Sequence, residues 1–142
     1  MSPSDEPLSI LIGRTAKDLN RAFDEALTAA GGSTATWLVL SALKAADHRT
    51  QGDLARAIGL QEPTLTYHLD NLRRRGFVTR ERAPDNRRVQ RVVVTDAGEQ
   101  LFLRLRRAAA SFDGRLRAGL GEDEVTELRR LLAQVTENAQ PD

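Results

Sequence analysis

The chain has 142 residues, of which 40% are hydrophobic and 29% are charged, and its formal net charge is +1. This balance is typical of a globular protein, and no apolar run approaches the roughly 20 residues of a membrane-spanning helix. Because cysteine is absent, disulfides, thiolate metal sites and thiol redox sensing are excluded. His48 and His68 do not form a common metal-ligand spacing, so we expect no metal and no cofactor.

The N-terminal part predicts a short tail and two helices. Residues 1–7 carry no basic cluster typical of a secretory signal, so we expect a disordered tail and a cytoplasmic protein. Apolar residues recur at three- and four-residue steps from Leu8 to Ala30, and Gly31-Gly32 ends this long helix. A second helix, capped by Ser33 or Thr34, runs to near Ala46.

Two short helices follow a polar connection at 47–49. Thr50, with Asp53 three positions on, forms a variant of the capping box, and Gly59 ends the first short helix. Pro63 suits the first position of the next helix, which ends before Gly76. Two short helices joined by about four residues that include a glycine are typical of a helix-turn-helix.

The period then changes from helical to two, which predicts a β-hairpin. We expect strands at Phe77 to Arg82 and Val89 to Val94, with a turn at 83–86 and with Val92 and Val94 on one face. A helix-turn-helix followed by a hairpin is a winged helix. The predicted fold is therefore mainly α with a small β-hairpin wing, and the winged helix-turn-helix DNA-binding domain covers 33–95.

The chain ends with two more amphipathic helices. The first, from Asp96 to about Ala118, would span about 35 Å at 1.5 Å per residue, and the second follows Gly121 and fades at Asn138. Long apolar stripes at both ends of a self-sufficient winged helix need a partner surface. We therefore expect 8–32 and 96–138 to form the dimerisation region of a homodimer. A monomeric bundle is the alternative.

The predicted helix from Pro63 to Arg75 carries the candidate base contacts. Steps of 100° per residue place a buried stripe of leucines on one side of this helix and a polar face on the opposite side. Residues near the start of such a helix usually enter the groove deepest, so Thr64 and Tyr67 are favoured for contacts with bases and Arg74 for a contact with phosphate. An acid at Asp70 would repel DNA, so we expect it to pair with an arginine. An ordinary exposed helix face is the alternative interpretation. The candidate DNA-binding residues of this helix are Pro63, Thr64, Thr66, Tyr67, His68, Asn71 and Arg74.

The predicted wing supplies further cations. The stretch from Gln61 to Arg91 contains eight arginines and four acidic residues, so it has a local net charge of +4 in a nearly neutral chain. Arginine is well suited to forked contacts with phosphate and guanine. Arg87 and Arg88 follow the turn and point to opposite faces, so at most one enters a minor groove. Asp85 is placed to brace an arginine two residues on. A solvated charged face or an ordinary hairpin is the alternative.

A small effector, if there is one, is expected at aromatic residues near the junction of the first helices with the DNA-binding unit. Phe23 and Trp37 are the candidates for this effector pocket, although an aromatic residue on an amphipathic helix usually belongs to the core. His68, on the flank of its helix, is more typical of packing than of sensing.

The order of elements and several segments resemble the MarR family of multiple-antibiotic-resistance regulators. The segments that carry the resemblance are 51–55, Leu65-Thr66, 69–72, 76–80, 84–88 and 94–98. The resemblance implies a dimer on a palindromic operator, a wing arginine at Arg87 braced by Asp85, and release by a small, often aromatic molecule. Tyr67 and Arg73 depart from the family pattern, which implies a different base preference.

The function expected from the sequence is that of a sequence-specific DNA-binding transcriptional regulator. We expect a homodimeric repressor of a palindromic operator in double-stranded DNA, released by a small aromatic or lipophilic effector. The alternative is a winged-helix protein–protein interaction module without DNA binding, which would expose an apolar patch in place of the arginines. No phosphate loop, carboxylate pair or nucleophile–histidine arrangement is evident, so we do not expect an enzyme.

Overall fold

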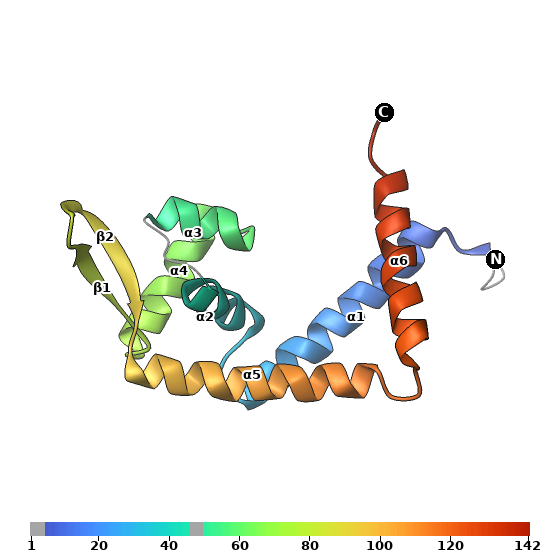
Figure 1. Cartoon of the computed structure of the whole chain (residues 1–142), viewed down its shortest axis with the longest axis horizontal. Helices are drawn as coiled ribbons and strands as arrows, with labels where there is room; N and C mark the ends of the chain where they lie inside the picture. The colour runs from blue at the N-terminus through green and yellow to red at the C-terminus, as the bar shows by residue number, and fades with distance from the viewer. Residues whose placement is uncertain (1–4, 46–49) are drawn as a thin grey trace. The chain divides into compact units, whose positions relative to one another are not determined.

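The computed structural model describes residues 5–45 and 50–142. Within them the chain is mainly helical with one antiparallel hairpin, which confirms the predicted fold class (Figure 1). The chain divides into two compact units, Met1–Ala109 and Ala110–Asp142. The elements are α1 (Leu8–Ala29), α2 (Thr34–Ala45), α3 (Gln51–Ile58), α4 (Glu62–Arg74), β1 (Val78–Ala83), β2 (Asn86–Val94), α5 (Asp96–Leu116) and α6 (Glu122–Asn138).

Local capping sets the ends of the first helices. Ser33 Oγ accepts a hydrogen bond of 3.1 Å from the Thr36 amide at the start of α2. Thr50 Oγ1 accepts one of 3.0 Å from the Asp53 amide at the start of α3. Gly59 then closes α3 in the left-handed conformation (φ +73°), which glycine adopts without a steric penalty. These caps lie where the sequence predicted them.

Some boundaries differ from the prediction by one to three residues. Helix α4 begins at Glu62, so Pro63 occupies its second position, where a backbone N–H is also dispensable. Strand β1 begins at Val78 instead of Phe77, and β2 begins at Asn86 instead of Val89, because pairing continues into the turn. The predicted polar connection at 47–49, with His48, lies outside the described residues.

The hairpin packs one face onto the helices. Val78 pairs with Val94 and Arg80 with Val92, with an irregularity after Arg82. Val92 and Val94 pack against the core, as the period of two predicted. The hairpin therefore forms one body with the helix-turn-helix.

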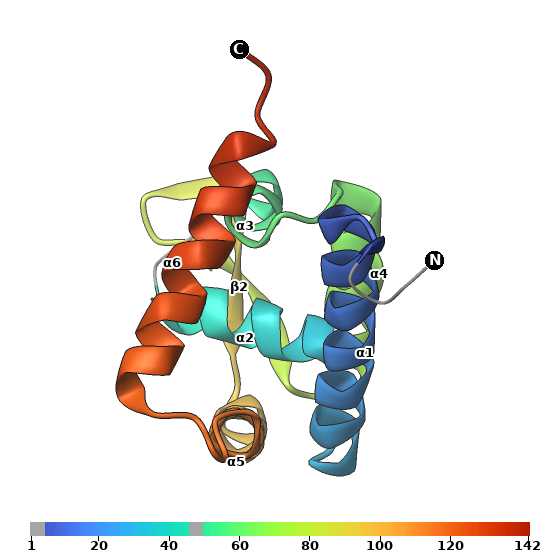
Figure 2. The same cartoon turned by 90° about the vertical axis from the view of Figure 1, so that its right-hand side faces the viewer.

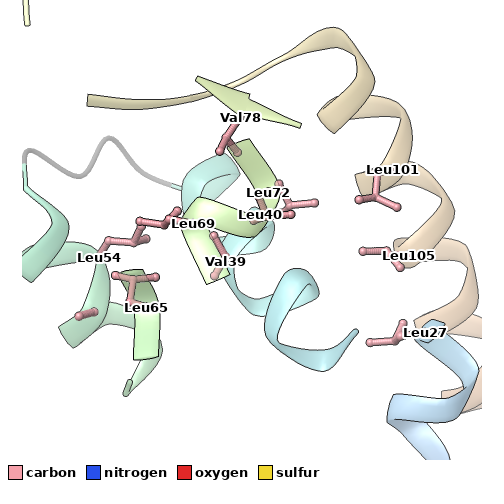
Figure 3. Packing of buried hydrophobic residues seen from close by; sticks show 11 residues of the cluster. Leu27, Val39, Leu40, Leu54, Leu65, Leu69, Leu72, Val78, Leu101 and Leu105 are labelled. Atoms are coloured by element: carbon pink, nitrogen blue, oxygen red, sulfur yellow. The ribbon is translucent and has the colours of Figure 1, made fainter. Parts of the chain in front are cut away.

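One hydrophobic core joins the elements of the first unit. Figure 3 shows its leucines and valines converging from α1, α2, α3, α4, β1 and the first part of α5. Helix α4 contributes three of them, so one side of this helix faces inward along its whole length. The buried members are Leu27, Val39, Leu40, Leu54, Ala55, Leu65, Leu69, Leu72, Val78, Leu101 and Leu105.

Helix α2 packs across the first part of α5, as Figure 2 shows in a view along α5. The rings of Trp37 and Phe102 stack with their centroids 5.5 Å apart. Lys44 Nζ lies 2.6 Å from a carboxylate oxygen of Glu99. These contacts fix α2 on the first part of α5.

Several apolar stripes remain uncovered in the single chain. Helix α1 buries only Leu27, whereas Leu8 is 61% exposed. Helix α6, all of whose residues are described, buries none, and Leu128, Leu131 and Leu132 are exposed. Each stripe is uncovered within its own compact unit.

Within 5–45 and 50–142, no individual helix has the length and apolar character needed to cross a membrane. Helices α1 and α2 meet that test only as a pair bent by 76°, by length and composition alone.

Candidate nucleic-acid interface

Helix α4 has a buried side and an outward polar side. Leu65, Leu69 and Leu72 are almost fully buried and orient the helix. Pro63, Thr64, Tyr67 and Arg74, from the opposite face, are exposed, as the 100° spacing predicted. Tyr67 is 66% exposed, an unusual position for a large aromatic ring that no packing requires. This face offers a phenol, a hydroxyl and a guanidinium to a partner.

The flanks of α4 are half-buried, and one flank residue, Thr66, makes hydrogen bonds within the protein. The Thr66 hydroxyl donates to the Glu62 carbonyl oxygen at 2.9 Å and also accepts a hydrogen bond from the Gln51 side-chain amide. Thr66 therefore ties α4 to α3, a role that the sequence analysis did not anticipate. His68 is half-buried, and its ring meets Tyr67 edge-on at 5.4 Å. Asn71, which the helical spacing sets on the polar face with Tyr67 and Arg74, is half-buried instead of exposed.

Asp70 is neutralised by arginines, as expected from the sequence. Its carboxylate lies 3.4 Å from the Arg73 guanidinium on the same helix and 3.8 Å from that of Arg80 on β1. The pairing compensates the one acid near the middle of the polar face, which would otherwise repel a polyanion. It also connects the helix to the hairpin.

The hairpin turn presents its residues to solvent. Pro84 and Asp85 are exposed at the tip, and Asn86 Oδ1 accepts a hydrogen bond of 3.0 Å from the Arg88 amide. The Arg88 side chain is exposed. The backbone of Arg87 lies in β2, but its side chain is outside the described part of the structure, so its brace by Asp85 stays a prediction.

Two exposed arginines beside the polar face make contacts within the protein. Arg73 contacts Asp70. Arg75 Nη2 donates to the Gly31 carbonyl oxygen at 3.1 Å, and its guanidinium lies 4.9 Å from the centre of the Phe77 ring. No sequence pattern predicts this contact of Arg75, because its partner is a backbone oxygen 44 residues away.

Comparison with known proteins agrees with this geometry. The MarR family model matches residues 31–89, from the turn after α1 into β2. The CouR transcriptional repressor, solved bound to a 23-mer DNA duplex, is 28% identical over 96% of each chain, with a TM-score of 0.83. Residues 31–89 are therefore similar to the MarR family, and the whole chain is similar in fold to the CouR repressor.

Two further structures extend the likeness to the terminal helices. A MarR-family regulator from Rhodococcus sp. RHA1 is 25% identical over 95% of each chain, with a TM-score of 0.75. MarR from E. coli in its apo form is 27% identical, with a TM-score of 0.74, over 92% of this chain and 97% of that one. The family fold therefore includes α1, α5 and α6 as well as the winged helix.

The aromatic residues that we considered for an effector pocket lie at the edge of the core. Phe23 and Trp37 are both partly buried and pack against it. The ring of Trp37 stacks on that of Phe102 and so joins α2 to α5, whereas Phe23 packs against the same core from α1. Among the described residues, no group of three or more His, Asp or Glu is arranged to hold a metal ion.

Proposed function

We propose that this chain is a sequence-specific transcriptional regulator that binds a palindromic operator as a homodimer. The observation that carries the proposal is the outward polar face of α4, held in one body with an arginine-bearing hairpin. In a winged helix-turn-helix, such a helix enters the major groove, and the wing lies along the phosphates or in the minor groove. The CouR repressor, which shares this fold, was solved with DNA bound.

In this proposal, Thr64, Tyr67 and Asn71 contact base edges, with Pro63, Thr66 and His68 around them. Arg74 and the wing residues Arg87 and Arg88 contact phosphate or the minor groove. Tyr67 supports the assignment because its phenol can both donate and accept hydrogen bonds at a largely exposed position. Thr66 contributes mainly by fixing α4 on α3.

The homodimer rests on the uncovered stripes of α1 and α6. Leucines that are 40–60% exposed along two helices are more than single scattered surface residues. A second copy covers such stripes with two-fold symmetry and sets two α4 helices at a fixed separation. Binding then occurs on half-sites about one helical turn, or about 34 Å, apart.

Release by a small aromatic or lipophilic effector is the regulatory part of the proposal, with repression as its consequence. It is supported by three partly buried aromatic residues that pack against the same core from α1, α2 and α5, namely Phe23, Trp37 and Phe102. A ligand inserted there would act on α1, α2 and α5 together. A non-catalytic role in the bacterial cytoplasm, where the chromosome is accessible, belongs to the same proposal.

The test begins by selecting bound DNA from random fragments of the source genome. Recovered sites, labelled with a fluorophore, are then titrated at several salt concentrations. We expect the logarithm of affinity to fall with the logarithm of salt by about 0.9 for each neutralised phosphate. Arg87→Ala and Arg88→Ala should each weaken binding to all sites, whereas Arg129→Ala, at an exposed position on α6, serves as the control.

Failure to enrich any fragment at low salt would refute DNA recognition and favour the protein–protein module. That alternative requires an apolar patch on the winged helix. In the described part of 33–95, Leu38 and Tyr67 are the large apolar side chains that are well exposed, and they come from different helices. The structure therefore offers the module little apolar area.

A further inference from the structure

The segment that follows α4 is fastened to two other elements. The Arg75 guanidinium donates to the Gly31 carbonyl oxygen in the turn between α1 and α2. Thr95, which precedes α5, donates through its hydroxyl to the Gly76 carbonyl oxygen at 2.6 Å and through its amide to the Phe77 carbonyl oxygen at 3.0 Å. The C-terminal end of α4 is therefore bound to both α1 and α5.

The turn that accepts from Arg75 is itself fixed on α5. Arg104 Nε donates to the Ala30 carbonyl oxygen at 3.5 Å. Gly32 lies so close to α5 that an added Cβ would be 2.8 Å from a methyl carbon of Leu105. Gly31 has φ +102°, a conformation that few other residues adopt. The backbone at 30–32 therefore keeps its position against α5.

The other polar attachments of α4 do not reach these helices, with which α4 otherwise shares the apolar core. Thr66 connects α4 to α3, and Asp70 connects it to β1. Both partners belong to the winged helix itself. Among the polar contacts that we describe for α4 and the residue that ends it, the bond from Arg75 is the one that extends to the end of α1, the helix with the uncovered apolar stripe.

Arg75 is also poorly placed to serve a phosphate. Its guanidinium is shared between the Gly31 carbonyl oxygen and the face of the Phe77 ring. A contact with DNA would have to use its remaining N–H groups with the guanidinium held in this position, or else give up both interactions. Arg74, one position earlier, is exposed on the polar face and does not carry that cost.

We infer that Arg75 is a positioning residue, which fixes the separation and angle of the two α4 helices in the dimer and thereby selects the spacing of operator half-sites. The inference rests on the proposed function and deepens it. Removing the guanidinium leaves α4 joined to the winged helix but loosens it from α1. The dimer should then accept half-sites at spacings that the parent protein rejects.

The experiment uses the full chain and a half-site pair recovered by selection with the parent protein. The DNA series consists of duplexes in which zero, one or two base pairs are added or removed between the half-sites. Each duplex is titrated with the parent protein, Arg75→Ala and Arg75→Lys. Arg107→Ala, at an exposed position on α5, is the control. Each base pair turns one half-site by about 34–36° relative to the other, since B-DNA has 10–10.5 base pairs per turn.

For Arg75→Ala we expect about tenfold weaker binding at the preferred spacing, the scale of one charge-assisted hydrogen bond. Binding at the other spacings should change less, so that the preference flattens, while the salt slope stays that of the parent. Arg75→Lys, which keeps a charged donor, should regain most of the preference. Arg107→Ala should match the parent.

Two outcomes would overturn the inference. A salt slope reduced by about 0.9 would make Arg75 a phosphate contact. An unchanged spacing preference in Arg75→Ala would show that the bond to Gly31 does not set the geometry. If the parent protein binds no DNA at all, the proposed function fails instead.

A measurement without DNA separates these two failures. Hydrogen exchange of the free protein reports the Gly76 and Phe77 amides, which bond to Arg73 and Leu72 carbonyl oxygens at the end of α4. Arg75→Ala should raise exchange there and in the turn at 30–32, with little effect on α3. Exchange that equals the parent's would count against the inference whatever the DNA result.

Discussion

The carboxylate of Asp70 on α4 lies 3.8 Å from the guanidinium of Arg80 on β1, so an ion pair joins the recognition helix to the wing. A second guanidinium, that of Arg73, lies 3.4 Å from the same carboxylate. All three side chains are partly exposed, so the pairs contribute little to folding stability, about 0–1 kcal/mol each. Their main effect is on charge and on the orientation of the hairpin.

Replacing Asp70 by Asn tests this role. The change releases two arginines and removes one negative charge beside the polar face. We expect affinity for unrelated DNA to rise several-fold at low salt while discrimination between the operator and unrelated DNA falls. Competition titrations with operator and random duplexes measure both. Asp18→Asn, which breaks an exposed pair with Arg21 on α1, is the matched control; an equal effect there would remove the special role of Asp70.

Substitutions at Arg74 and Tyr67 should affect different properties of DNA binding, the affinity for all sequences and the preference among sequences. Arg74→Ala is expected to weaken binding to all sequences and to lower the salt slope by about 0.9, because one phosphate contact is lost. Tyr67→Phe keeps the ring but not the hydroxyl, so it should change the preferred base at one position of each half-site, with a loss of about 1–3 kcal/mol there. Selection from random duplexes with each variant provides the measurement. Identical recovered sites for Tyr67→Phe and the parent would exclude a base contact by this hydroxyl.

Local signals in the sequence were sufficient to predict the winged helix. Thr50 and Gly59 cap α3 as expected, because a cap is decided by residues within one turn. The alternation at Val92 and Val94 likewise predicted the buried face of β2. These features depend on neighbours in the chain, and the sequence displays neighbours directly.

Contacts between distant segments were not predictable in the same way. Thr66 accepts from Gln51, 15 residues away, and Arg75 donates to a backbone oxygen 44 residues away. From the sequence, Arg75 was one of several interchangeable cations in a basic stretch. Its partner carries no side-chain signal, since every residue has a carbonyl oxygen. Packing of α1, α4 and α5 decides this contact.

A charged substitution on α6 should prevent dimerisation without disturbing the folding of the single chain. Leu131 is 46% exposed on a helix that buries none of its residues, so Leu131→Glu costs the single chain little packing. In a dimer the same carboxylate would be buried in an apolar interface without a partner. We expect sedimentation to show monomers at concentrations where the parent is dimeric, with unchanged helical content and at least 100-fold weaker operator binding. Arg129→Glu adds a carboxylate at another exposed position of α6, and dissociation by both changes would indicate general charge repulsion instead.

Two glycines of α5 provide a matched pair for the joint between α5 and the end of α4. An added Cβ at Gly98 would lie 2.1 Å from the Phe77 carbonyl oxygen and 2.7 Å from a Val94 methyl carbon, whereas one at Gly114 has no neighbour within 4 Å. Gly98→Ala must therefore push α5 away from the segment that ends α4, which should lower the free energy of unfolding by about 1–3 kcal/mol. Gly114→Ala should raise it by up to about 1 kcal/mol, because alanine favours the helix. Urea unfolding followed by circular dichroism gives both values, and a Gly98→Ala protein as stable as the parent would mean that α5 and Phe77 are not in close contact in solution.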